Sequence, residues 1–130
     1  MNVRREGRVT IVQAPRRITA TGGARMLRRR LFELLGEGSP RIVLNLEPTI
    51  YMDSFGLAEL IAIYKRTREL NGAMAVQCPP GRVRDLLHVT RLDDVLEAYA
   101  DEATAVAAVR GPGEAGDPGA PVARRPVPSA

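Results

Sequence analysis

The chain has 130 residues, of which 45% are hydrophobic, and it carries a formal net charge of +4. This length is enough for one domain with a buried core, but not for two comfortable ones. The sequence contains no run of about 18 apolar residues that could span a membrane, and its first residues lack the apolar segment of a secretory signal. We therefore expect one cytoplasmic domain without membrane insertion.

Two residue types limit the chemistry further. Cys78 is the single cysteine and His88 the single histidine. One cysteine excludes an internal disulfide framework, and one histidine leaves no spaced set of metal ligands. We therefore expect neither a metal nor a cofactor, and we expect Cys78 to be a small buried residue at a strand end.

Arginine supplies nearly all of the positive charge, because Lys65 is the only lysine. A basic chain can bind nucleic acid, but two Phe, three Tyr and no Trp leave little surface on which bases could stack. Four arginines instead fall on the polar face of a predicted amphipathic helix. We therefore expect no direct nucleic-acid partner. The four are Arg25, Arg28, Arg29 and Arg30, opposite the apolar Met26, Leu27, Leu31, Leu34 and Leu35.

The first elements are predicted by β-branched runs and by helical spacing. Residues 9–12 are β-branched and predict a strand, paired with a short strand around Val3. Pro15 ends this pairing, because proline has no backbone donor. The amphipathic helix covers about residues 24–35 and ends at Gly36.

The middle of the chain predicts a central strand followed by a long helix. Residues 42–46 form a short and nearly continuous apolar run, typical of a strand covered on both faces, which Pro48 closes. A helix follows over about residues 54–70, and Asn71 ends it in the left-handed conformation that helix ends favour. The helical spacing i, i+3, i+4, i+7 gives this helix an apolar stripe of Leu57, Leu60, Ile61 and Tyr64.

The last third continues the alternation of strands and helices. Residues 73–77 predict a strand, and a helix follows through Val83 and Leu87. A weaker strand candidate covers residues 95–99, and Asp101 caps a final helix that runs to about Val109.

Nine of the last twenty residues, 111–130, are Gly or Pro, so we expect a disordered tail there. The remaining pattern predicts an α/β sandwich with a mixed central sheet of about four to five strands and about four helices.

Ser54 begins the long helix and is the most informative candidate. A hydroxyl at a helix N-terminus lies beside unpaired backbone N–H groups and the positive end of the helix dipole, where a phosphate is accepted. Two structural alternatives stay open: Ser54 as an unmodified N-cap, and Asp53 as a purely capping residue. Gly56 permits either a close approach of another backbone or a tight helix start.

The order of these elements, and the sequence within them, resembles the STAS domain of bacterial anti-sigma factor antagonists. The resemblance covers roughly residues 8–110 and predicts that residues 1–110 form the domain. It is carried by the strand Ile42-Val43-Leu44-Asn45-Leu46, the junction Tyr51-Met52-Asp53-Ser54-Phe55-Gly56-Leu57, the helix exit Asn71-Gly72-Ala73, and Arg82-Val83-Arg84-Asp85-Leu86-Leu87 followed by Thr90-Arg91-Leu92.

The resemblance implies a switched protein interaction. Such an antagonist binds an anti-sigma factor that is also a GHKL-type serine kinase, and so frees a sigma factor for transcription. The kinase inactivates the antagonist by phosphorylating the serine after the aspartate, here Ser54, and a serine phosphatase restores it. The implied partner-binding residues are Asp53, Ser54, Phe55, Gly56 and Leu57.

Two departures from the family pattern bear on this serine. Many members have a second Ser or Thr after it, whereas this chain has Phe55. Many also have an acidic residue after the first long strand, where this chain has Arg16 and Arg17. Because arginine holds a phosphate by paired hydrogen bonds where aspartate would repel it, a phosphorylated state here would have different electrostatics.

Other functions have less support. The same fold could act as a STAS scaffold that is not phosphorylated, in a stressosome-like or lipid-transport complex. An enzyme would need Asp53, Ser54 and His88 as a triad, but no Gly-x-Ser-x-Gly elbow is present. Thr21-Gly22-Gly23 lacks the lysine of a phosphate loop. We therefore expect a protein-interaction module and not an enzyme, with the oligomeric state left open.

Overall fold

The computed structural model describes residues 1–38 and 40–110, and the predicted tail at residues 111–130 lies outside them. The described part contains four α-helices, one 3-10 helix and a mixed five-stranded sheet, with a second sheet of two short strands. The predicted α/β class, with four to five strands in the central sheet and four helices, is therefore confirmed.

The central sheet is parallel except for one edge strand. β1 runs antiparallel to β2, with Val3 opposite Val12, which confirms the predicted pairing. The remaining neighbours pair in parallel. The strand order is β1 (Val3–Glu6), β2 (Val9–Gln13), β4 (Arg41–Asn45), β6 (Ala73–Gln77), β7 (Glu97–Tyr99).

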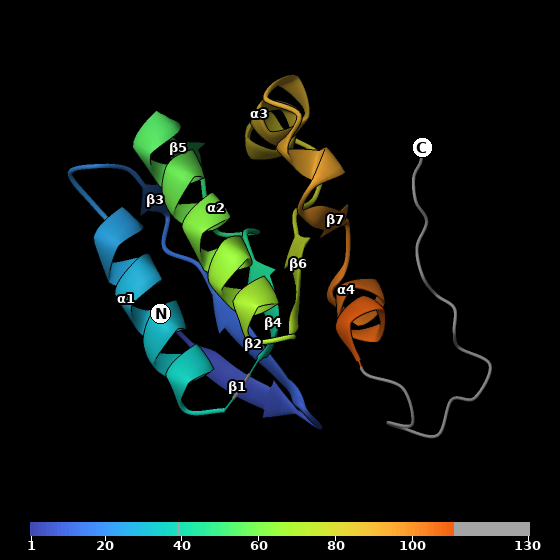
Figure 1. Ribbon diagram of the computed structural model, residues 1–130. Coiled ribbons are helices and arrows are strands. Elements are labelled where there is room, and N and C mark those ends of the chain that lie inside the picture. The colour runs from blue at the N-terminus through green and yellow to red at the C-terminus, as the bar shows by residue number, and fades with distance from the viewer. Residues whose placement is uncertain (39, 111–130) are drawn as a thin grey trace.

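The helices divide unequally between the two faces of the sheet. From β2 through β4 and β6 to β7, each parallel strand lies on the same side of the one before it in the sequence. Right-handed crossovers therefore put the connecting helices on the same face of the sheet. Figure 1 shows α1 and α2 side by side there, while α4 lies on the other side of the sheet. The helices are α1 (Ala24–Gly36), α2 (Ser54–Glu69), α3 (Arg82–Val89) and α4 (Glu102–Val109).

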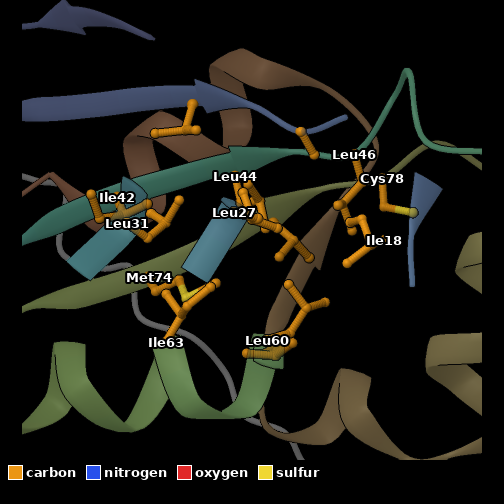
Figure 2. Packing of buried hydrophobic residues seen from close by; sticks show 14 of the residues in the cluster. Ile18, Leu27, Leu31, Ile42, Leu44, Leu46, Leu60, Ile63, Met74 and Cys78 are labelled. Carbon is orange, nitrogen blue, oxygen red and sulfur yellow. The ribbon is translucent and has the colours of Figure 1, made fainter. Parts of the chain in front are cut away.

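The main core lies between the sheet and the α1–α2 layer. Leu27 from α1 and Leu60 and Ile63 from α2 are fully buried, as are Ile42 and Leu44 of the central strand. Figure 2 shows these side chains gathered between the two layers. Each such burial contributes about 1.5–3 kcal/mol. This packing fixes α2, and therefore the position of its first residue.

A small second sheet, which the sequence did not predict, joins two loops above the main sheet. β3 (Arg17–Ile18) pairs in parallel with β5 (Tyr51–Met52). Pro15 interrupts the first pairing as predicted, but pairing resumes two residues later. The small sheet ties the loop after β2 to the segment that leads into α2.

Two predicted apolar stripes need correction. Met26 is 48% exposed, so it is not part of the buried stripe of α1. In α2, Leu57, Ile61 and Tyr64 are only half-buried against the core. The fully buried side of α2 is centred instead on Gly56, Leu60, Ile63 and Thr67. The reason is that α2 packs against α1 and β6 at once, so its buried face is rotated toward α1.

The last predicted strand begins later than expected. A 3-10 helix at Leu92–Asp94 follows a left-handed Arg91, and β7 starts only at Glu97. Val95 is therefore exposed instead of pairing in the sheet. By contrast, the left-handed Asn71 after α2 is confirmed by its φ of 59°.

Candidate functional site

Ser54 is the first residue of α2, and its side chain is exposed. The N-cap of the helix is Asp53, not Ser54, so the alternative in which Ser54 is the capping residue is wrong. The first turn of α2 contains no acidic residue. An exposed hydroxyl thus lies at the positive end of a 16-residue helix, where the N-cap Asp53 supplies the only acidic side chain of the helix start.

Asp53 uses both carboxylate oxygens to hold this helix start in place. Oδ1 accepts a hydrogen bond of 2.9 Å from the Gly56 backbone N–H, which is the predicted cap. Oδ2 accepts one of 3.1 Å from the N–H of Ala20, in the loop between β3 and α1. The bond from Gly56 is the main reason why the pKa of Asp53 is lowered. Asp53 is therefore a charged clamp between two segments.

Gly56 is required by a close backbone contact. A Cβ atom at this position would lie 2.0 Å from the carbonyl oxygen of Ile18, so no other residue fits without a shift. The close approach and the tight helix start that the sequence left open therefore occur together. Gly56 is buried, so it positions the site instead of forming its surface.

Phe55 and Leu57 lie on different sides of the helix start. Both are half-buried and pack against the main core. The guanidinium of Arg25 lies over the Phe55 ring, 5.4 Å from its centroid, within cation–π range. Of the five predicted partner-binding residues, Ser54 is the exposed one, Asp53, Phe55 and Leu57 are partly exposed, and Gly56 is buried.

Two exposed apolar residues beside the site were missed from the sequence. Ile50 is 49% exposed and Tyr51 is 43% exposed, and they lead into Ser54 through β5. The guanidinium of Arg17 lies 5.2 Å from the centroid of the Tyr51 ring, which brings the unexpected Arg16-Arg17 pair to this end of the molecule. Alternation within β5, which places Tyr51 opposite the buried Met52, accounts for the outward Tyr51 but not for the exposed Ile50, which precedes the strand.

The enzyme alternative finds no support in these contacts. His88 is exposed, and its Nδ1 lies 3.0 Å from Asp93 Oδ2. The carboxylate of Asp53 accepts hydrogen bonds from backbone N–H groups and not from His88. Asp53 and His88 therefore do not form a triad with Ser54. The described residues contain no group of three or more His, Cys, Asp or Glu side chains that could hold a metal ion.

The remaining candidate residues have structural roles. Gly23 has a φ of +90°, and a Cβ there would lie 1.9 Å from the Arg17 carbonyl, so it allows the β3 loop to pack on the start of α1. Cys78 is buried, as predicted, and burial raises the pKa of its thiol. Among the helices of the described region, none is long and apolar enough to cross a membrane.

Comparison with known proteins agrees with this fold. The family model of the STAS domain matches residues 1–105. The chain belongs to the STAS domain family. The resemblance seen in the sequence is therefore confirmed, and the relatives that it matches are named as anti-sigma factor antagonists.

Three relatives illustrate the similarity. A Thermotoga neapolitana protein, named as an anti-sigma factor antagonist by homology, is 28% identical over 78% of this chain and 90% of its own. The structure of an anti-sigma factor antagonist from Mycobacterium paratuberculosis has a TM-score of 0.75 at 24% identity, covering 83% and 91% of the two chains. The Bacillus cell fate determinant SpoIIAA, in its phosphorylated form, has a TM-score of 0.63 at 16% identity, covering 84% and 98%.

Proposed function

We propose that this protein is a cytoplasmic anti-sigma factor antagonist that phosphorylation of Ser54 switches off. In its unmodified form it binds an anti-sigma factor that is also a GHKL-type serine kinase, and so releases a sigma factor. Transfer of a phosphate to Ser54 ends the interaction, and a serine phosphatase restores it. The observation that carries the proposal is the exposed Ser54 hydroxyl at the start of α2, held by the Asp53 clamp.

The electrostatics of the helix start favour a modified Ser54. A phosphoserine adds a charge of about −1.5 to −2. The positive end of α2 tolerates that charge. The neighbouring acidic side chain is the N-cap Asp53, whose carboxylate is engaged by the N–H groups of Gly56 and Ala20, and the first turn adds no further acidic residue. A docking surface formed by exposed apolar residues, such as Ile50 and Tyr51, does not tolerate it, because the charge would have to be desolvated there. The same phosphate is therefore compatible with the fold and incompatible with the complex.

Binding to a GHKL-type anti-sigma factor kinase from the same organism tests the switch. We expect Ser54→Ala to bind close to wild type and Ser54→Asp to bind at least about tenfold more weakly, a loss of about 1.4 kcal/mol. Ala103→Asp is the matched control, because it adds the same charge to the exposed first turn of α4. Ala103→Asp should bind like wild type. If Ser54→Asp also binds like wild type, the switch is wrong.

The second candidate keeps the fold and the surface but removes the modification. A constitutive STAS scaffold in a stressosome-like or lipid-transport complex would also use Ile50 and Tyr51 for docking, and Phe55 in place of the usual Ser or Thr favours it. Binding to a neighbouring sigma-regulatory kinase supports the switch. Binding to a transporter component, unaffected by Ser54→Asp, supports the scaffold.

A further inference from the structure

A groove open to solvent runs between α1 and α2, next to the proposed switch. Its volume is about 520 Å³, and its openness suits a segment of a macromolecule better than an enclosed small ligand. Its lining combines three arginines, one aromatic ring and two glutamates: Arg25, Arg28, Arg29, Phe32, Glu33 and Glu59.

Two of the three arginines are held in place by aromatic rings. Arg25 lies over Phe55, and Arg28 lies over Phe32 with 5.0 Å between its guanidinium carbon and the ring centroid. Arg28 is further fixed by Glu59, 3.5 Å away, whose side chain is only 9% exposed. Guanidinium groups held in this way lose less conformational entropy when they bind a carboxylate. This distinguishes the groove from an ordinary solvated helix face.

The groove keeps an excess of positive charge. Glu59 offsets Arg28, and Glu33 pairs with Arg30, with 3.3 Å between Arg30 Nη1 and Glu33 Oε1. Among the described residues, Arg25 and Arg29 have no carboxylate within ion-pair distance. Arg25 also lies in the first turn of α1, at the positive end of that helix. The two uncompensated charges favour an anionic occupant electrostatically.

The lining favours protein carboxylates over a polyphosphate. Glu33 and Glu59 would repel a continuous phosphate backbone. The rings of Phe32 and Phe55 each have a guanidinium over them, so they are poorly placed to stack bases. A segment with carboxylates spaced between other side chains meets the arginines and avoids the glutamates.

We propose that the α1–α2 groove, defined by its six lining residues, binds an acidic segment of the protein partner. Arg25 joins the groove to the Ser54 site through its contact with Phe55, so the two form one continuous docking surface. The identity of the partner rests on the proposed function. The preference of the groove for carboxylates does not.

Titration of the ¹⁵N-labelled full chain with a synthetic helical peptide of Leu and Glu tests the chemistry directly. We expect the backbone amide signals of α1 and of the start of α2 to shift, and Arg25→Glu/Arg29→Glu to weaken binding at least tenfold. Arg68→Glu/Arg82→Glu is the matched control, since it reverses the same number of charges at two exposed arginines outside the groove. Shifts elsewhere, equal binding of a Leu and Lys peptide, or tighter binding of a DNA duplex would each overturn the proposal.

The same variants separate this inference from the proposed switch. If the anti-sigma factor kinase responds to Ser54→Asp but not to Arg25→Glu/Arg29→Glu, the switch stands and the groove does not contribute. If the acidic peptide requires the two arginines while Ser54→Asp leaves kinase binding unchanged, the groove stands and the switch fails.

Discussion

The starts of α2 and α4 have the same local chemistry, yet only one of them has the features of a site. Both have an extended aspartate as N-cap, Asp53 and Asp101, and each accepts a hydrogen bond from the backbone N–H three residues later, at 2.9 and 2.8 Å. In both aspartates these bonds lower the carboxyl pKa. Capping alone therefore says nothing about function.

The differences lie in what surrounds each cap. The second oxygen of Asp53 binds the Ala20 N–H of a distant loop, whereas the carboxylate of Asp101 accepts a bond from its own helix. The next residue of α4 is Glu102, which already supplies a negative charge and pairs with Arg4 of β1. At α2 the corresponding residue is the uncharged, exposed Ser54. The start of α2 is therefore distinguished by the bond from Asp53 to a distant loop and by an uncharged serine where α4 already has a glutamate.

Gly56→Ala should have the largest effect, because the start of α2 touches the β3 backbone and that of α4 does not. The added Cβ would lie 2.0 Å from the Ile18 oxygen, so we expect a loss of about 3 kcal/mol in the free energy of unfolding. Urea denaturation measures it. Gly36→Ala, with open space around its Cβ, is the control and should be neutral or stabilising. Equal effects of the two substitutions would refute the close packing.

The two caps should differ in their dependence on neighbouring structure. Asp53→Ala removes bonds to two segments, and Asp101→Ala removes a bond within one helix, so we expect the larger fall in Tm for Asp53→Ala. Hydrogen exchange should also quicken at Ala20 only in Asp53→Ala. A similar fall in Tm without faster exchange at Ala20 would mean that the clamp adds nothing beyond capping.

Acid should remove the stabilisation that the two capping aspartates, Asp53 and Asp101, contribute to the folded protein. Since the folded-state pKa of each aspartate is depressed, the stabilisation is present above the unfolded value of about 3.9 and is lost as the pH falls through the folded pKa. Thermal unfolding between pH 6 and pH 2 measures this dependence. Asp53→Asn and Asp101→Asn should each flatten it. A slope in Asp53→Asn as steep as that of wild type would contradict the role of the carboxylate charge.

The smallest effect concerns the stacked arginine beside the site. Arg17→Gln removes the cation–π contact with Tyr51 and should cost about 0.5–1 kcal/mol. Arg82→Gln, on an exposed arginine at the start of α3, serves as control. Near-ultraviolet circular dichroism should report a changed Tyr51 environment only in Arg17→Gln. An unchanged spectrum would show that the stacking does not persist in solution.

The fold was largely predictable because its main elements obey local rules. The apolar run at residues 42–46, the left-handed Asn71 and the Asp101 cap were each placed correctly from their neighbours in sequence. The small β3–β5 sheet was not, because two-residue strands next to prolines carry too little pattern to be recognised. The rotated buried face of α2 was missed because it depends on packing between other elements.

The site was predictable in position but not in detail. The sequence placed Ser54 at a helix start through local capping preferences and family resemblance. It could not separate a capping Ser54 from a capping Asp53, because both residue types are preferred caps and the choice depends on where the helical backbone begins. Nor could it show the second bond of Asp53, to the Ala20 N–H 33 residues away. Nor could it show that Arg25 lies on Phe55, since that contact arises only when α1 packs beside α2.

Mass spectrometry of the protein isolated from its own cells tests the central claim most directly. Intact mass gives the number of phosphates, and fragmentation gives their position. We predict a reproducible single phosphate on Ser54, whose proportion changes with growth conditions, and its absence from Ser54→Ala. A protein without phosphate on Ser54 under all conditions, or one phosphorylated at another residue instead, would contradict the switch.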